Sequence, residues 1–266
     1  MPELPEVETI RTAVASAVVG ARITSVAVNR DKIRLPIPAD FKQIVESATV
    51  VSVTRRAKYI FILLDNRETI VVHLGMSGKI TLTRDYVFRK HDHLVFYFDN
   101  GLVMSYNDAR RFGFVSLLKC VDLSNLGVDA LDEAFNATYL RDKIAKLSAP
   151  IKTVMLDQSV VGGIGNIYII ESLFKSGISP FRPAKSLRDA ELEKLVCDIK
   201  DVLIAAIACG GTTLRDYRKA SGELGYFQNK LAVYGKEGQP CPHCSALIRR
   251  AVQGGRSTFY CPECQR

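Results

Sequence analysis

The spacing of apolar residues changes twice along the chain. Over residues 6–19 apolar positions recur at helical spacing, which predicts one amphipathic helix that ends at Gly20. From about residue 21 to 118 the apolar residues instead lie in short β-rich runs. The runs are ITSVAV, VVSVTRR, YIFILL, TIVVHL, HLVFYF, GLVMSY and FVSLL. These short strands, with a type I′ hairpin expected at Asn100-Gly101, predict an antiparallel sandwich or barrel.

Beyond about residue 125 the pattern becomes helical. The clearest helix follows a capping-box-like start at residues 186–189, carries an apolar stripe and stops at Gly210-Gly211. Its stripe consists of Leu192, Leu195, Val196, Ile199, Leu203, Ala206 and Ile207. Two further helical stretches between residues 151 and 176 flank the glycine-rich segment VGGIGN. The chain therefore divides into a β region, a helical region and a short tail.

The composition adds information mainly about the binding partner of the protein. The 266 residues are 47% hydrophobic, enough for more than one core, and contain no apolar run of about 18 residues. The acidic, prolyl start is unlike a signal peptide, so we expect a cytoplasmic protein. Lys and Arg number 36 against 28 Asp and Glu, for a net charge of +8. This balance suits a polyanionic partner, either nucleic acid or an acidic membrane surface.

Four of the seven cysteines form the pattern CPHC…CPEC within the last 26 residues. The pairs are Cys241 with Cys244 and Cys261 with Cys264. Two C-x2-C knuckles at this separation predict a tetrahedral four-cysteine zinc site, and two disulfides are the alternative. His243 is expected to be a surface residue within the first knuckle. Cys120, Cys197 and Cys209 lack partners at metal spacing, and we expect them to be buried small hydrophobic residues.

The segment VVGGIGNIY at residues 160–168 is not a nucleotide-binding loop. It matches neither G-x-G-x-x-G nor G-x-x-x-x-G-K-[ST], and it follows a helical stretch rather than a strand. A glycine-rich turn that opens a helix still presents free backbone N–H groups, which suit a nucleic-acid phosphate. A helix hairpin that merely needs glycine is the alternative.

A set of motifs in a fixed order links the chain to a known family. The motifs are MPELPEVET, RRAKY, HLGMSG, KHDH, RRFG, GIGNIY, VYG and the terminal cysteines. With them, the chain resembles the bacterial formamidopyrimidine-DNA glycosylases from residue 2 to its end. The resemblance implies excision of oxidised purines, chiefly 8-oxoguanine and formamidopyrimidines, from duplex DNA, followed by strand cleavage through β,δ-elimination.

The resemblance also implies an architecture. It is an α+β multidomain protein with an N-terminal antiparallel β-sandwich and leading helix at residues 1–130. A helical domain with a helix-two-turn-helix follows at 131–222, and a four-cysteine zinc ribbon at 223–266. We expect one structural Zn²⁺, damaged double-stranded DNA as partner, no membrane association, a monomeric state, and action on the bacterial nucleoid in the cytoplasm.

Four catalytic residues follow from the resemblance: Pro2, Glu3, Glu6 and Lys58. The nucleophile of the family is the N-terminal proline, exposed after removal of the initiator methionine. An α-amino group titrates near pH ~8, so a useful fraction is unprotonated at neutral pH. Glu3 is expected to protonate the opening sugar, Glu6 to stabilise the cationic intermediate or position Pro2, and Lys58 to bind a phosphate beside the lesion.

The remaining site residues are DNA contacts implied by the same motifs. Met76, Arg110 and Phe112 match the set that fills the gap left by the flipped base. The other expected contacts are His73, His91, Lys152, Asn166, Tyr234 and Arg256. The loop at residues 218–228 resembles one that closes over the flipped purine.

Two features depart from the family pattern, and two other functions stay open. A Gly-Pro-acid-Pro stretch is replaced by Gly-Val-Asp-Ala at residues 127–130, which suggests a looser loop, and Ala109 stands where proline is common. One alternative is an endonuclease VIII-like enzyme for oxidised pyrimidines, which shares fold and chemistry. The other is a catalytically inactive lesion-binding protein, against which the intact Pro2, Glu3, Glu6 and Lys58 argue.

Overall fold

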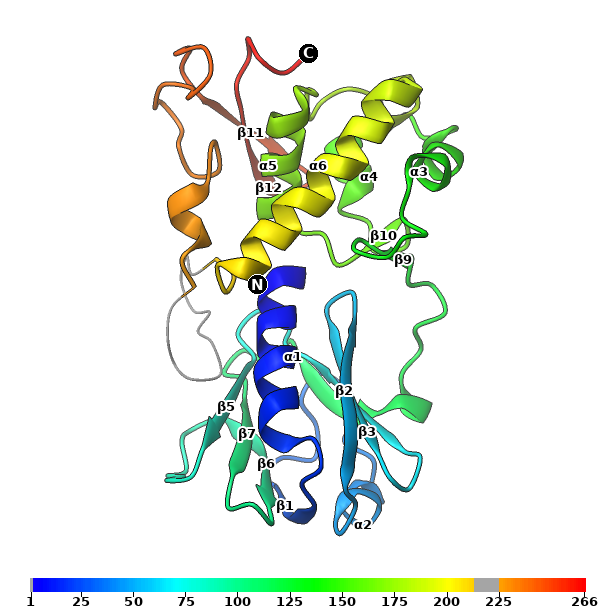
Figure 1. Ribbon diagram of the computed structural model, residues 1–266, viewed down its shortest axis with the longest axis vertical. Coiled ribbons are helices and arrows are strands. Elements are labelled where there is room, and N and C mark those ends of the chain that lie inside the picture. Colours follow the sequence, from blue (N-terminus) through cyan, green and yellow to red (C-terminus); the bar gives the residue numbers. More distant parts are fainter. Residues whose placement is uncertain (1, 213–224) are drawn as a thin grey trace. The chain divides into compact units, whose positions relative to one another are not determined.

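The computed structural model describes residues 2–212 and 225–266, which belong to two compact units. The β unit comprises Met1–Leu123 and Cys209–Tyr226, and the helical unit comprises Ser124–Ala208 and Phe227–Arg266. Figure 1 shows the order of the elements along the chain. The β unit therefore takes in a segment from late in the sequence, which no periodicity in the chain indicates.

The β unit is a sandwich of two four-stranded antiparallel sheets behind a leading helix. The sheets have the orders β1-β6-β7-β5 and β2-β3-β4-β8. The helices are α1 (Leu4–Val18) and α2 (Phe41–Val45); the strands are β1 (Ile23–Val28), β2 (Val50–Arg56), β3 (Tyr59–Leu64), β4 (Thr69–His73), β5 (Lys79–Thr83), β6 (Asp92–Phe98), β7 (Val103–Asn107) and β8 (Phe114–Leu117). The structure thus selects the sandwich over the barrel.

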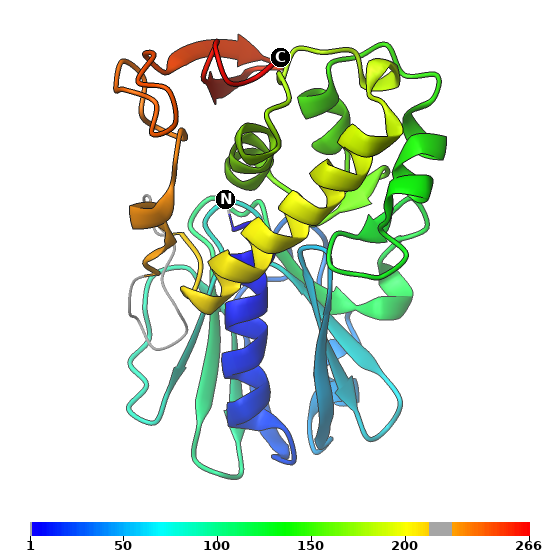
Figure 2. The ribbon, with the colours of Figure 1, turned by 45° about the horizontal axis from the view of Figure 1, so that its top comes forward.

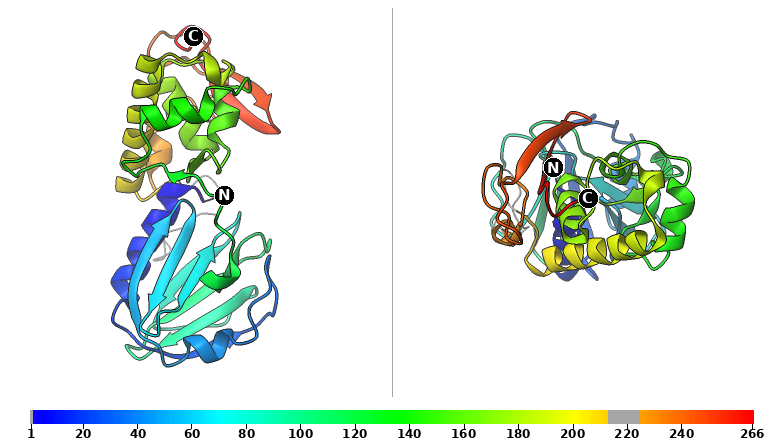
Figure 3. Two further views of the ribbon diagram at one scale, coloured as in Figure 1. Left: turned by 90° about the vertical axis from the view of Figure 1, so that its right-hand side faces the viewer. Right: turned by 90° about the horizontal axis from the view of Figure 1, so that it is seen from above.

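Alternation of side chains along the strands builds the core of this unit. In β3, Ile60, Ile62 and Leu64 are buried while the residues between them are half-buried, as a sheet with one face against the core requires. The apolar stripe of α1, including Ile10 and Val14, belongs to the same buried cluster. In the left view of Figure 3, α1 runs along the flank of the strands.

Three local predictions in the β unit need correction. The sequence pattern missed α2 and β5, because five-residue elements with two or three apolar residues carry little periodicity. The hairpin between β6 and β7 forms as predicted, but Asn100 does not have positive φ, so its turn is not type I′. The Gly101 N–H donates to the Phe98 carbonyl at 3.1 Å, so residues 98–101 form a tight turn. Gly101, the last residue of this turn, has a left-handed φ of 78°.

The helical unit contains four α-helices and two pairs of short strands among its described residues. The helices are α3 (Ala137–Ile144), α4 (Ile151–Met155), α5 (Asn166–Ser176) and α6 (Asp189–Ala208); the strands are β9 (Val128–Asp129), β10 (Val161–Gly162), β11 (Arg249–Gln253) and β12 (Arg256–Tyr260). Helix α5 packs against both α6 and β12 (Figure 2). Three short 3-10 helices lie at Leu118–Cys120, Ala184–Ser186 and Phe227–Lys230, the first of them in the β unit.

Helix α6 forms where its apolar stripe predicts, but its cap lies two residues further on. Ser186 donates to the Pro183 carbonyl at 2.7 Å and does not cap the helix. The carboxylate of Glu191 instead accepts from the backbone N–H of Arg188 at 2.9 Å. Glu191 therefore satisfies a donor that the helix itself leaves unpaired.

Two expectations about single segments are wrong. Cys120 and Cys197 are exposed and Cys209 is half-buried, so these cysteines are not core residues. The segment 127–130 is also not loose. Gly127 N–H donates to the Gln158 carbonyl at 2.8 Å, Ala130 N–H donates to the Gly162 carbonyl at 3.0 Å, and Ala130 is fully buried. Pairing of β9 with β10 fixes this segment without the prolines.

Candidate functional site

The first turn of α1 gathers the predicted catalytic acids around the N-terminus. Pro2, Glu3 and Glu6 are all buried. One oxygen of the Glu6 carboxylate accepts from the backbone N–H of Glu3 at 2.8 Å, and the other accepts from Thr212 N–H at 2.8 Å. Glu6 therefore ties the start of α1 to a segment about 200 residues later in the chain.

Gly211 is required for this contact. Its φ of +80° is unfavourable for other residues, and a Cβ there would lie 2.9 Å from Oε1 of Glu6. The glycine pair that ends α6 in the sequence thus has a second purpose, since it lets the backbone approach the Glu6 carboxylate. The sequence pattern alone indicates Gly211 only as the end of a helix.

Lys58 and His73 lie at neighbouring strand ends of the β unit. Lys58 occupies the two-residue turn between β2 and β3 and is only 7% exposed. Tyr59, the next residue, pairs with His73 across β3 and β4, with ring centroids 4.9 Å apart. The structure thus brings together a cation and an imidazole that are expected to contact DNA phosphates.

His73 is held neutral by its surroundings. Burial, followed by the positive charges of Arg34 and Lys58, lowers the pKa of His73 to about 4, against an opposing effect of Asp108. Its Nδ1 accepts from Gly75 N–H at 3.2 Å, which places the ring proton on Nε2. His73 can therefore meet a phosphate as a neutral N–H donor.

Met76, Arg110 and Phe112 lie on two turns that are joined through Asp108. The Asp108 carboxylate is fully buried and accepts from the Ser77 hydroxyl at 2.6 Å and from Gly113 N–H at 2.9 Å. Ser77 in turn accepts from Arg110 N–H at 3.1 Å. The motifs did not indicate Asp108, although it lies only two residues before RRFG.

The side chains of this predicted set are displayed on the surface. Met76 is 38% exposed and Phe112 is 46% exposed, and the Arg110 guanidinium lies 4.8 Å from the centroid of the Phe112 ring. A hollow of about 340 Å³ is lined by Arg34, His73, Gly75, Met76 and Phe112. Met76 and Phe112 are therefore available to contact a partner and are not part of the core.

Glycines of the two motifs allow the turns to touch. A Cβ on Gly75 would lie 2.3 Å from Gly113 N, and a Cβ on Gly113 would lie 2.2 Å from the Tyr106 hydroxyl oxygen. Neither distance is compatible with a side chain, so both positions need glycine. The glycines of HLGMSG and RRFG therefore serve one shared contact.

His91 adjoins the same pair of turns through its backbone. It adopts a left-handed φ of 76°, and its carbonyl accepts from Asp108 N–H at 3.2 Å. Its ring is half-buried and lies 6.3 Å from that of His93.

In the helical unit, three predicted DNA contacts converge on the β11–β12 hairpin. Asn166 at the start of α5 donates through Nδ2 to the Ser257 carbonyl at 3.0 Å. Lys152 of α4 donates through Nζ to Thr258 Oγ1 at 2.7 Å. Arg256, which begins β12, is exposed beside them. The N-terminus of α5, which follows the glycine-rich turn, therefore lies next to the hairpin that carries Arg256.

Lys152 is fully buried, which sequence analysis did not foresee. Burial and the charge of Arg256 lower the pKa of Lys152 to about 8. The Lys152 ammonium donates to Thr258, so Lys152 supports the hairpin that carries Arg256.

Tyr234 is positioned by a buried carboxylate on α5. Glu171 is 6% exposed and accepts from the N–H groups of Ala232, Val233 and Tyr234 at 2.8–3.0 Å. The Tyr234 ring meets Phe259 of β12 edge-on, with centroids 5.2 Å apart. Glu171 is a further positioning residue without a signal in the sequence pattern.

The four terminal cysteines form a cluster of suitable size for zinc. Their Sγ atoms all lie within 4.8 Å of one another. The Cys241–Cys264 and Cys244–Cys261 separations are 3.9 Å and 3.4 Å, near the roughly 3.8 Å expected between thiolates around a tetrahedral zinc and far beyond a disulfide bond. The geometry therefore favours the zinc site over the two disulfides.

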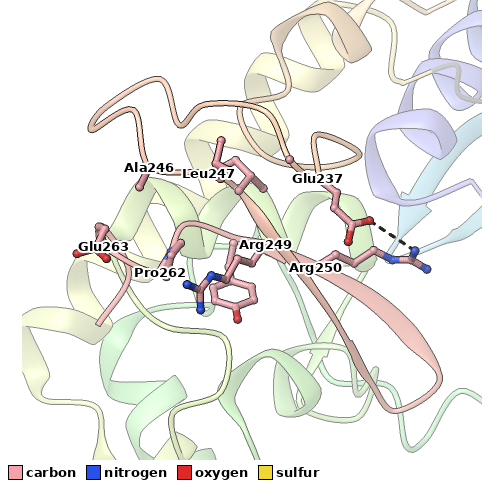
Figure 4. Close-up of a pocket in the computed structure, with 10 residues that line it drawn as sticks. Glu237, Ala246, Leu247, Arg249, Arg250, Pro262 and Glu263 are labelled. Carbon is pink, nitrogen blue, oxygen red and sulfur yellow. Dashed lines mark ion pairs between the residues drawn. The ribbon is translucent and has the colours of Figure 1, made fainter.

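His243 lies outside this cluster, as expected. It is exposed and stacks on Phe174 with centroids 4.8 Å apart. A hollow of about 550 Å³ flanks the zinc module (Figure 4), where Arg250 pairs with Glu237 at 3.7 Å. None of the sequence-predicted site residues lines that hollow. The loop at 218–228 lies mostly outside the described residues.

Comparison with known proteins identifies the family of the chain. Residues 1–115 match the formamidopyrimidine-DNA glycosylase N-terminal domain, 126–218 its H2TH domain, and 238–266 a zinc finger found in FPG and IleRS. A formamidopyrimidine-DNA glycosylase of Jannaschia sp. is 46% identical over 283 residues, covering all of both chains.

Solved structures give the same result. The Lactococcus lactis Fpg in complex with DNA that contains an abasic site is 32% identical with a TM-score of 0.89, covering all of both chains. The MutM (Fpg) protein of Thermus thermophilus is 36% identical with a TM-score of 0.88, covering 99% of this chain and 98% of that one. Among the described helices, none is long and apolar enough to cross a bilayer. The chain belongs to the formamidopyrimidine-DNA glycosylase family of DNA-repair glycosylases, with one structural zinc in its four-cysteine finger.

Proposed function

We propose that this protein is a bifunctional glycosylase and AP lyase that excises oxidised purines, 8-oxoguanine and formamidopyrimidines, from duplex DNA. One observation carries the proposal. Glu3 and Glu6 are buried at the first turn of α1, directly beside Pro2, and Glu6 is hydrogen-bonded on both oxygens. A protein that only bound DNA would not need two buried acids at this terminus.

In the proposed mechanism Pro2 is the nucleophile once Met1 has been removed. Its secondary amine attacks C1′ of the damaged nucleotide as the bond between C1′ and the base breaks, and the proton that the amine loses balances the proton that the departing base takes up. The sugar ring then opens as its C1′–O4′ bond breaks. Glu3 protonates the opening sugar. The product is an iminium without an N–H, so it stays cationic and acts as an electron sink. Loss of a C2′ proton then expels the 3′ phosphate, and a second proton loss from the conjugated sugar expels the 5′ phosphate.

Binding would be divided among both units and the zinc module. Lys58, His73 and His91 from the β unit, with Asn166, Tyr234 and Arg256 from the helical unit, contact the DNA backbone. The buried Lys152 holds the hairpin that carries Arg256. Met76, Arg110 and Phe112 fill the space left by the extruded base. We place the activity in the bacterial cytoplasm, on nucleoid DNA, with the protein as a monomer.

Excision assays on defined duplexes test this function. The duplexes carry 8-oxoguanine or thymine glycol opposite each normal base, and release of the base and strand cleavage are followed separately. We expect 8-oxoguanine to be removed and the strand to be cut, with Glu3→Gln slower by roughly 10²–10⁴-fold. A preference for thymine glycol would instead support the endonuclease VIII-like alternative. Binding without excision would support an inactive lesion-binding protein.

A further inference from the structure

The loop between β5 and β6 exposes two adjacent apolar side chains. Val87 is 76% exposed and Phe88 is 62% exposed. Two basic residues, Arg89 and Lys90, follow them directly and are also exposed. Large apolar side chains scattered singly on a surface need no explanation, but an adjacent pair beside cations indicates a surface that meets a partner.

A buried carboxylate fixes this loop. Asp92 is 2% exposed, and its Oδ2 accepts from the Tyr86 hydroxyl at 2.9 Å and from Arg89 N–H at 2.9 Å. Its Oδ1 accepts from Asn107 Nδ2 at 2.9 Å. Hydrogen bonds to Asp92 therefore anchor the chain on both sides of Val87 and Phe88. These anchors keep the two side chains exposed to solvent.

The same anchors join the loop to the turn that carries Arg110. Asn107 Nδ2 also donates to the Lys90 carbonyl at 2.9 Å, and Asp108 N–H donates to the His91 carbonyl at 3.2 Å. Asp108 is the residue that holds the Met76 and Phe112 turns together. A ligand seated on Arg110 thus lies next to the loop within a single unit.

The exposed charges around the loop are mainly positive, which favours an anionic ligand. Arg89 and Lys90 on the loop, and Arg110 and Arg111 on the neighbouring turn, are all exposed. Arg84 lies at the other end of β5, where it donates to the Asn100 carbonyl at 2.7 Å. Asp85 is the exposed acid of the loop, while Asp92 and Asp108 are buried. Apolar side chains flanked by cations suit a DNA groove, where the sugars and base edges are apolar and the rims are phosphates.

We propose that residues 87–90 form an additional contact with duplex DNA beside the lesion, on the side of Arg110. Phe88 and Val87 pack against sugars and base edges in the groove, and Arg89 and Lys90 bind phosphates. The inference rests on the proposed function, because it assumes that the duplex lies on Arg110. It adds Val87, Phe88 and Arg89 as contacts outside the family motifs, next to Lys90 at the start of KHDH.

Binding of a short duplex with a tetrahydrofuran abasic analogue tests the proposal, by anisotropy over a range of salt concentrations. Phe88→Ser should weaken binding about five- to tenfold. The double change Arg89→Gln and Lys90→Gln should reduce the slope of log K against log salt by about 1.8, since each phosphate contact contributes about 0.9. Ile204→Ser, at an exposed apolar position of α6 (58% exposed), is the matched control and should bind like the wild type.

The outcomes separate this proposal from the function on which it rests. If the wild-type protein binds and excises lesions while the loop variants, folded by thermal denaturation, bind within twofold and keep the wild-type salt slope, the loop does not contact DNA. The exposed pair would then serve a protein partner, and the proposal is refuted. If the wild-type protein itself fails to bind the lesion duplex, the proposed function fails together with the loop.

Discussion

Removing the Asp108 side chain tests how the two gap-filling turns are held. Its buried carboxylate accepts one hydrogen bond from Ser77 at 2.6 Å and one from Gly113 N–H at 2.9 Å. The replacement Asp108→Ala removes both acceptors and leaves both donors without them. The backbone carbonyl, which contacts His93 at 2.8 Å, is unaffected.

The expected loss follows from these two contacts. Hydrogen bonds to a charged group contribute about 1.5–3 kcal/mol each, so the loss of two in Asp108→Ala should lower the free energy of unfolding by roughly 3–6 kcal/mol. Asp108→Asn keeps one acceptor oxygen but presents an NH₂ group to the other donor. It should therefore cost roughly half as much.

Urea denaturation of the full chain measures these values, and lesion binding is measured where each variant remains folded. Asp31→Ala is the control, since Asp31 is exposed and should change stability by no more than about 0.5 kcal/mol. Because the turns carry Met76, Arg110 and Phe112, Asp108→Ala should also weaken lesion binding. An unfolding free energy within about 0.5 kcal/mol of the wild type would refute this assignment of Asp108.

Three further predictions concern single residues. Arg110→Ala should weaken discrimination for cytosine opposite the lesion by roughly 1–3 kcal/mol, the value of a bidentate base contact; equal loss or no loss opposite all four bases would contradict it. Cys244→Ser should lose zinc, measured by elemental analysis, and DNA binding, while the β unit stays folded; full DNA binding by a zinc-free preparation would contradict the role of Arg256. His73 has a folded pKa near 4 and an unfolded pKa near 6.5, so between these values the unfolded chain binds more protons. Stability should therefore fall as the pH drops from about 6.5 to 4, and His73→Gln should remove part of that fall in urea denaturation at pH 7 and pH 5.

Elements with a clear repeat could be predicted from the sequence. Helix α1 and helix α6 carry apolar stripes over several turns, and the seven predicted strands are short apolar runs bounded by turn residues. The missed elements, α2 and β5, have five residues each, and polar residues interrupt their apolar positions, so neither stands out as an apolar run. The turn after Asn100 differs from the predicted type because the hairpin loop takes one more residue, with Gly101 in the left-handed position.

Site residues with a motif could be named in advance, but the residues that position them could not. Asp108 and Glu171 are hubs whose partners are backbone N–H groups and a hydroxyl from other segments. Gly211 is needed because Glu6 approaches it from the opposite end of the chain. Such contacts depend on tertiary packing, which local spacing does not encode.

Borohydride trapping is the most direct test of Pro2 as nucleophile. Reduction during turnover on an 8-oxoguanine duplex converts an iminium to a stable amine, so the account predicts a covalent protein–DNA adduct at Pro2 of a chain that lacks Met1, mapped by peptide mass spectrometry. An N-terminal extension before Pro2 should abolish the adduct, because an amide nitrogen cannot attack C1′, while binding through Lys58 and Arg256 persists. An adduct at Lys58 or any other lysine, or an active enzyme that retains Met1, would contradict this mechanism.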